Sequence, residues 1–113
     1  MKQKLIDILE TFCPAFLQGT MNPDESYPEE FITFWIPATA DNAHYDNAVR
    51  SVVWTFYVIY YSDDPQRVNT KPFEIAAALK AANFVQQGRG YDILSDEPTH
   101  TGWAMDFTYT EKL

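Results

Sequence analysis

The sequence predicts an α+β domain, with a four-stranded sheet and two helices packed on one face, in the chain order α-β-β-α-β-β. Apolar residues recur every three or four positions in residues 2–13 and again in 69–87, which is the spacing of amphipathic helices. The stretch SVVWTFYVIYY (51–61) is dense in β-branched and aromatic residues, as strands are. Apolar and polar residues alternate over 103–110, which is the period of a strand with one packed face. At 113 residues the chain is predicted to form one domain, 1–113, with one core.

The first predicted helix presents one apolar stripe, and Pro14 is expected to end or kink it. The stripe consists of Leu5, Ile6, Leu9, Phe12, Cys13 and Phe16. Cys13 is the only cysteine of the sequence, so an internal disulfide is excluded. A catalytic thiol would need a supported histidine, and only His44 and His100 exist. We therefore interpret Cys13 as a small buried apolar group.

Turn-forming and polar residues flank the next expected strand, 31–36. The segment QGTMNPDESYPEE (18–30) carries four acids and no base, and predicts either a solvated connector or a contact loop to another subunit. Pro37 should stop the strand. The polar stretch that follows, 38–50, is expected to be a second loop.

The strand 51–61 is apolar on both faces. One side would carry Trp54, Phe56, Val58 and Tyr60, and the other would carry Val53, Tyr57, Ile59 and Tyr61. Two helices can cover only one of these sets. The uncovered set predicts a surface for protein contacts and self-association, unless loops fold over it.

The second predicted helix, 69–87, is expected to begin at a cap on Asn69 or Thr70, with Pro72 in its first turn. Gly88 and Gly90 are expected to end it. A short strand at 91–94 and the strand 103–110 then predict a hairpin with a loop of roughly six residues.

The loop SDEPTHTGW (95–103) gathers Asp96, Glu97 and His100 within five positions. A metal site or an acid–base pair would show such a pattern, but one short loop rarely supplies all the ligands of a metal. Asp, Pro, Thr and Gly are also the residues that turns require. We interpret the segment as a hairpin corner.

Other candidate chemistry is weaker. In HYDN, His44 and Asp46 flank Tyr45 with a spacing that could orient an imidazole, yet such pairs are common in surface loops. The GRG at 88–90 is too short for a phosphate loop, and no GxxxxGK[ST], GxSxG, HExxH or CxxC motif occurs. We predict no catalytic residues, no metal ligands and no cofactor.

The net charge of the chain limits the classes of partner that it is expected to bind. Sixteen acids against eight bases give a net charge of −8, which argues against binding to phosphate backbones or anionic membranes. The N-terminus MKQKLIDILE does not resemble a signal peptide, so a cytoplasm is the expected place of synthesis.

Four segments together resemble the small tail-terminator or tail-completion (minor tail) proteins of long-tailed bacteriophages and prophages. They are the acidic N-terminal helix, RSVVWTFYVIYYSDDP, FEIAAALKAANF and YDILSDEPTHTGWAMDFTY. The resemblance covers most of the chain and rests on the order of the predicted elements and on the kinds of residue in each of them. It implies a non-enzymatic virion subunit that forms a ring, usually hexameric, at the head-proximal end of the tail tube. The implied partners are further copies of the chain, the tail tube and the head connector, with no sequence-specific nucleic-acid binding and no membrane.

Three functions are therefore open: a tail-assembly subunit, a small acidic adaptor or inhibitor of a basic protein, and an enzyme or small-ligand binder using the histidines. The first is the leading hypothesis. For the interface we expect the loops 18–30 and 38–50 to contribute. The residues expected there are Trp35, Trp54, Tyr57, Tyr61 and His100.

Overall fold

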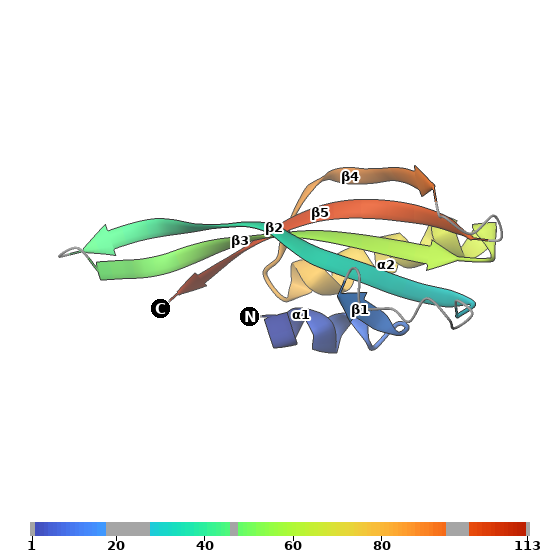
Figure 1. Ribbon diagram of the computed structural model, residues 1–113, viewed down its shortest axis with the longest axis horizontal. Helices are drawn as coiled ribbons and strands as arrows, with labels where there is room; N and C mark the ends of the chain where they lie inside the picture. Colours follow the sequence, from blue (N-terminus) through green and yellow to red (C-terminus); the bar gives the residue numbers. More distant parts are fainter. Residues whose placement is uncertain (1, 18–27, 46–47, 95–99, 113) are drawn as a thin grey trace.

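The structure, a computed structural model, describes residues 2–17, 28–45, 48–94 and 100–112; for 41–45, 48–50 and 94 it describes the backbone only. The described elements are α1 (Lys2–Leu9), β1 (Ala15–Leu17), β2 (Glu30–Tyr45), β3 (Ala48–Ser62), α2 (Pro65–Ala81), β4 (Val85–Leu94) and β5 (Thr101–Lys112). The predicted α+β class with two helices is confirmed (Figure 1).

The sheet has five strands in the order β1-β2-β3-β5-β4, so the prediction of four strands and the order α-β-β-α-β-β is wrong. The additional strand, β1, pairs in parallel with Ile32–Phe34 of β2, while the other pairs are antiparallel. A strand of three residues shows no readable alternation, and its pairing depends on a partner that follows a long connection. Sequence periodicity could not have found it.

The expected loop at 38–50 is also wrong over its described residues. Here β2 runs on to Tyr45 and β3 begins at Ala48, and the two form a long hairpin that projects beyond the helices (Figure 1). Pro37 does not stop β2. The register shifts between Trp35 and Ala38 instead, which accommodates a residue without an N–H. Cross-strand pairing thus overrides the low strand propensity of this polar segment.

Helix α2 begins earlier and ends earlier than predicted. Asp64 is its N-cap and accepts a hydrogen bond from the Gln66 N–H at 2.9 Å, with Pro65 in the first turn. Pro72 lies inside the helix, where it is buried. Asn83, at φ 73°, ends the helix, and the Phe84 N–H donates to the Leu79 carbonyl at 3.0 Å.

The predicted stop at Gly88 and Gly90 is wrong, because both glycines lie in β4. Helix α1 likewise ends at Leu9 rather than at Cys13, although turns continue it and the Cys13 N–H still donates to the Leu9 carbonyl at 3.4 Å.

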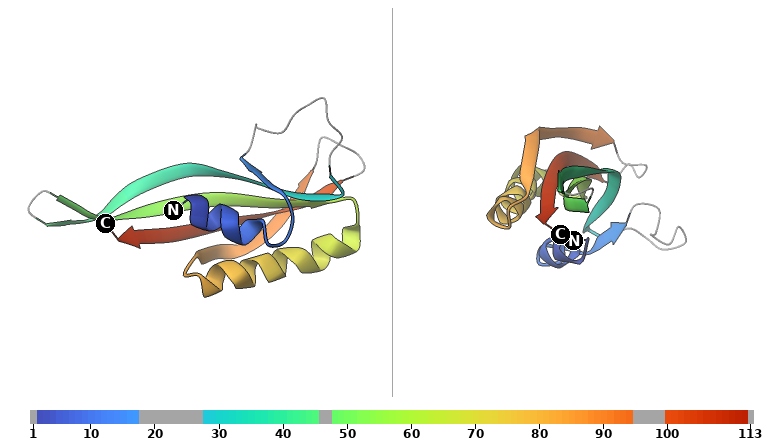
Figure 2. Two further views of the ribbon diagram at one scale, coloured as in Figure 1. Left: turned by 90° about the horizontal axis from the view of Figure 1, so that it is seen from below. Right: turned by 90° about the vertical axis from the view of Figure 1, so that its left-hand side faces the viewer.

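The core lies between the sheet and the two helices. Cross-strand register aligns Phe56 with Phe107 and Val58 with Met105, all four fully buried, and Leu5 and Ile75 reach them from α1 and α2. The predicted division of β3 into two faces is therefore confirmed, and the helices cover the Trp54–Phe56–Val58–Tyr60 side. Figure 2 shows both helices on one side of the strongly twisted sheet.

Among the described residues, no helix combines the length and the apolar character that crossing a membrane requires.

Candidate interaction surface

The sheet face opposite the helices carries a continuous set of side chains, which we call the open face. Its rows follow from the register: Trp35 aligns with Tyr57, Tyr57 with Asp106, and Asp106 with Gln87. The open face comprises Phe31, Thr33, Trp35, Thr55, Tyr57, Ile59, Tyr61, Ala104, Asp106, Thr108, Val85, Gln87, Tyr91 and Ile93.

The open face is buried at one end and exposed at the other. Phe31, Ile59 and Ala104 are buried, and the Phe31 ring stacks on Tyr61 at 4.9 Å. Further along the strands, Trp35 is 43% exposed and Val85 57%, and on the edge strand β4 Tyr91, which pairs with the buried Ala104, is 50% exposed. The Trp35 and Tyr57 rings meet at 5.4 Å across β2 and β3. The exposed part is therefore an aromatic and apolar strip across β2, β3, β5 and β4.

A carboxyl group interrupts this strip. Asp106 lies between Tyr57 and Gln87, and its Oδ1 atom is buried without a hydrogen-bond partner among the residues that the structure describes. Burial raises the pKa of Asp106 above its ordinary value. The pKa of Tyr91 is also raised, by burial first and then by the charge of Asp106. Desolvation thus disfavours the charged form of the Asp106 carboxyl.

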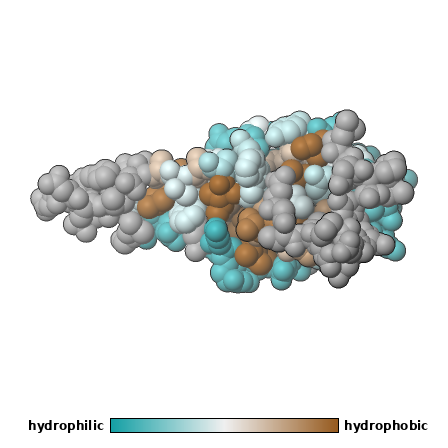
Figure 3. All heavy atoms as spheres, viewed as in Figure 1, coloured by the Kyte–Doolittle hydropathy of each residue, from teal (hydrophilic) through white to brown (hydrophobic). Residues whose placement is uncertain are grey.

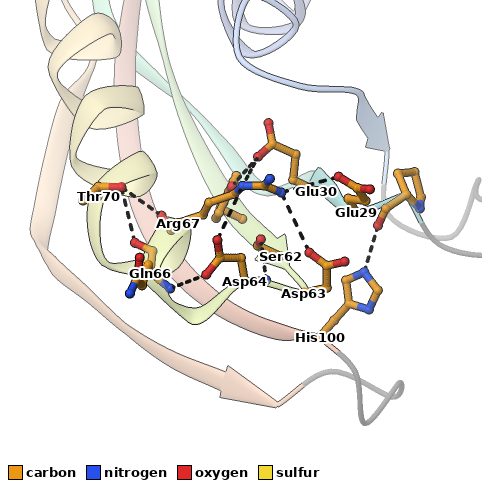
Figure 4. Close-up of polar contacts among 11 residues, drawn as sticks. Glu29, Glu30, Ser62, Asp63, Asp64, Gln66, Arg67, Thr70 and His100 are labelled. Carbon is orange, nitrogen blue, oxygen red and sulfur yellow. Dashed lines mark hydrogen bonds and ion pairs between the residues drawn. The ribbon is translucent and has the colours of Figure 1, made fainter.

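His100 is placed beside the buried end of the open face. Its Nε2 lies 2.8 Å from the Pro28 carbonyl oxygen, a distance at which the protonated nitrogen donates (Figure 4). The centre of its ring lies 5.9 Å from that of Phe31. The hairpin predicted around it is confirmed by the pairing of Leu94 with Thr101. His100 thus ties the start of β5 to the segment before β2.

The predicted acid–base and metal candidates do not assemble in the described part of the chain. Asp96, Glu97 and Asp46 lie outside the described residues, as does most of the loop 18–30. His44 lies near the far end of β2, whereas His100 contacts the segment just before this strand begins. The described residues contain no group of three or more His, Cys, Asp and Glu that could hold a metal ion.

Trp54 does not share the surface of the other expected interface residues. It lies on the helix side of β3, half-buried, with its ring parallel to Phe56 at 6.4 Å. Its indole N–H is buried and has no partner among the described residues. Trp35, Tyr57 and Tyr61 belong to the open face, so the expected interface set is divided between two sides of the sheet.

Sequence inspection missed a charged cluster at the start of α2. The Arg67 guanidinium lies within 3.7–3.9 Å of carboxylate oxygens of Glu29, Glu30, Asp63 and Asp64 (Figure 4). Glu30 also accepts a hydrogen bond from the Tyr60 hydroxyl at 2.9 Å. The cluster joins β2, β3 and α2, and only the i,i+3 and i,i+4 spacings of Asp64 and Asp63 from Arg67 were visible in the sequence.

Cys13 is buried, as interpreted from the sequence. Burial, followed by the charge of Glu30, raises the pKa of its thiol to about 12. The thiolate is the nucleophilic form, so Cys13 is unreactive at neutral pH and acts as part of the core.

Neither protein-family models nor curated proteins give a match to this chain.

Proposed function

We propose that the chain is a non-enzymatic assembly subunit that associates with further copies of itself through the exposed part of the open face. The observation that carries this proposal is the strip formed by Trp35, Tyr57, Val85 and Tyr91 on the side of the sheet without helices. Aromatic residues on an exposed sheet face favour contact with protein, because they bury a large area at low entropic cost.

The long hairpin supports the same proposal. It extends the molecule to 54 Å, and no helix accompanies its outer half (Figure 2). A neighbouring subunit would give such a two-stranded projection the packing that its own domain does not.

Contact by faces fits better than contact by strand edges. The described outer edge of β2 beyond Phe34 contains Pro37 and register shifts, and β4 contains a bulge between Gln87 and Tyr91. Proline and bulges are devices that block edge-to-edge strand addition. The open face remains as the surface that can accept a partner.

Within this class we propose a tail-terminator or tail-completion protein of a long-tailed phage or prophage, acting as a ring, six-membered in the usual case, on the head-proximal end of the tail tube. Support comes from the resemblance of the sequence in element order and residue types, together with the α+β fold and the projecting hairpin. Its partners would be the tail tube and the head connector, and its location the virion tail after assembly in the host cytoplasm.

Deleting the gene from the phage or induced prophage and imaging the lysate by electron microscopy tests this role. We expect tail tubes of uncontrolled length and heads without tails, with normal virions restored by the wild-type gene in trans. Normal virions from the deletion strain would contradict the proposal. Neighbouring genes for a major tail protein and a head–tail connector would support it further.

A further inference from the structure

A second surface, independent of the open face, has the features of a ligand site. A groove of about 300 Å³ lies between α2 and β4 and is lined by Phe73, Ala76, Ala77, Lys80, Gln86 and Arg89. Ala76, Ala77 and Lys80 follow Phe73 by three, four and seven positions, so these four residues of α2 share one helix face. Gln86 and Arg89 form the opposite wall.

The groove combines an apolar floor with two cations. Phe73 is 49% exposed and, with the two alanines, provides the apolar part. Neither Lys80 nor Arg89 makes an ion pair with any described residue. In a chain with a net charge of −8, two cations on one groove without an ion pair to any described residue are unexpected. They complement a ligand that carries negative charge.

The segment of β4 that carries Arg89 has a defined backbone conformation and is held by contacts with Trp103. Gly88 and Gly90 flank Arg89 at φ 75° and φ 102°, conformations that favour glycine, and they form the bulge of β4. The Trp103 indole N–H donates to the Arg89 carbonyl at 3.1 Å, and the Trp103 ring lies 6.2 Å from Phe73. A side chain at position 90 would collide with the Trp103 indole. Trp103 therefore contacts both the backbone of Arg89 and the ring of Phe73.

We propose that this groove binds a short acidic segment of a partner protein, with one aromatic or large aliphatic side chain on the floor and flanking carboxylates on Lys80 and Arg89. The volume lies at the lower end of the range for ligand sites and is large enough to hold one such side chain. Arginine and lysine bind carboxylates through charge-assisted hydrogen bonds, and Gln86 supplies an amide to the peptide backbone. A nucleic acid needs a basic surface that contacts several phosphates, and the two cations that line this groove are too few for that.

Peptide titration tests the proposal, with the full chain and three labelled pentapeptides, DEFDE, DEADE and NQFNQ, followed by fluorescence anisotropy and by amide NMR shifts. We expect DEFDE to bind most tightly, with shifts centred on Ala76, Ala77 and Gln86, and to bind more weakly as salt rises. The double variant Lys80→Gln/Arg89→Gln should lower its affinity at least about tenfold. The variant Lys2→Gln/Lys112→Gln loses the same charge elsewhere and should bind as the wild type does.

Several results would overturn the proposal. They are equal binding of the three peptides, unchanged affinity in the Lys80→Gln/Arg89→Gln variant, or shifts located away from the groove. Binding of phenylacetate or of an oligothymidylate at the groove as tightly as DEFDE would show that the occupant is not a protein segment. Because the measurement does not depend on self-association, its outcome is separate from that of the proposed assembly role.

Discussion

At the scale of single residues, Asp106 and Gly90 show how strongly the surroundings of a position determine the effect of its side chain on the stability of the fold. Asp106 belongs to a regular polar–apolar alternation, and the sequence places it on the polar side of its strand. In the folded chain it lies between Tyr57 and Gln87, with one oxygen buried and without a hydrogen bond to any described residue. Only the register with two neighbouring strands, which no single-strand pattern contains, shows that this carboxyl is desolvated.

Replacing Asp106 with asparagine should stabilise the fold at neutral pH. A carboxyl whose pKa is raised on folding binds its proton more tightly in the native state, so native stability falls as the pH rises from the unfolded pKa, near 3.8, through the folded pKa. Asp106→Asn removes this loss. Urea denaturation from pH 4 to pH 8 should show a higher midpoint for the variant at pH 7 and a smaller difference at pH 4. A lower midpoint at pH 7 would contradict the assignment.

The glycines of the β4 bulge provide a matched pair of substitutions. A Cβ at Gly90 would lie 2.6 Å from the Ala104 carbonyl oxygen and against Trp103, whereas a Cβ at Gly88 meets nothing within 4 Å. Gly88→Ala should cost about 1–2 kcal/mol, the cost of a left-handed backbone with a side chain. Gly90→Ala adds overpacking, for about 2–5 kcal/mol in total. Urea unfolding measures the free energy of unfolding of both variants. Equal losses would contradict the predicted overpacking and show that the Trp103 side chain can move away from a Cβ at position 90.

At the scale of elements, the sequence predicted the strands and helices with strong local patterns and failed where pairing between distant segments decides the structure. The strand 51–61, the alternation from Trp103 to Tyr109 and the hairpin around residue 100 are present. The polar half of β2 and the short β1 exist because neighbouring strands satisfy their backbone groups. The α2 boundaries were missed because Asp64, rather than Asn69 or Thr70, is the N-cap. The helix ends at the C-cap Ala82 and the positive-φ Asn83 rather than at Gly88 and Gly90.

The cap assignment of α2 predicts a specific pattern of stability. Asp64→Ala should destabilise the fold by about 1 kcal/mol, because the Gln66 N–H loses its acceptor. Asp64→Asn should retain most of the stability, since asparagine caps equally well. Asp63→Ala removes one exposed ion pair with Arg67 and should cost less than the cap. Thermal unfolding followed by circular dichroism separates the three. A larger loss for Asp63→Ala would assign the main contribution to the Arg67 cluster.

At the scale of the whole molecule, a two-layer body carries a projecting hairpin, an open sheet face and a groove on the helix side. Figure 3 shows apolar residues reaching the surface as separate clusters between hydrophilic regions on the side viewed there. The candidate site was predictable in kind, because the two faces of strand 51–61 were both apolar and two helices cover only one. The residues that make up the site were less predictable. The pairing of β4 places Tyr91 and Val85 on the open face, and the register of β3 places Trp54 on the helix side instead.

The central claim is that the chain associates with itself through the exposed part of the open face. Native mass spectrometry over a dilution series tests it most directly, with the wild type, Trp35→Asp, Tyr57→Asp and the control Thr70→Asp, which places a charge on the exposed surface of α2. Circular dichroism establishes that each variant is folded. We predict one defined oligomer for the wild type and for Thr70→Asp, and folded monomers for Trp35→Asp and Tyr57→Asp. A wild type that stays monomeric at every concentration, or open-face variants that assemble as the control does, would contradict the account.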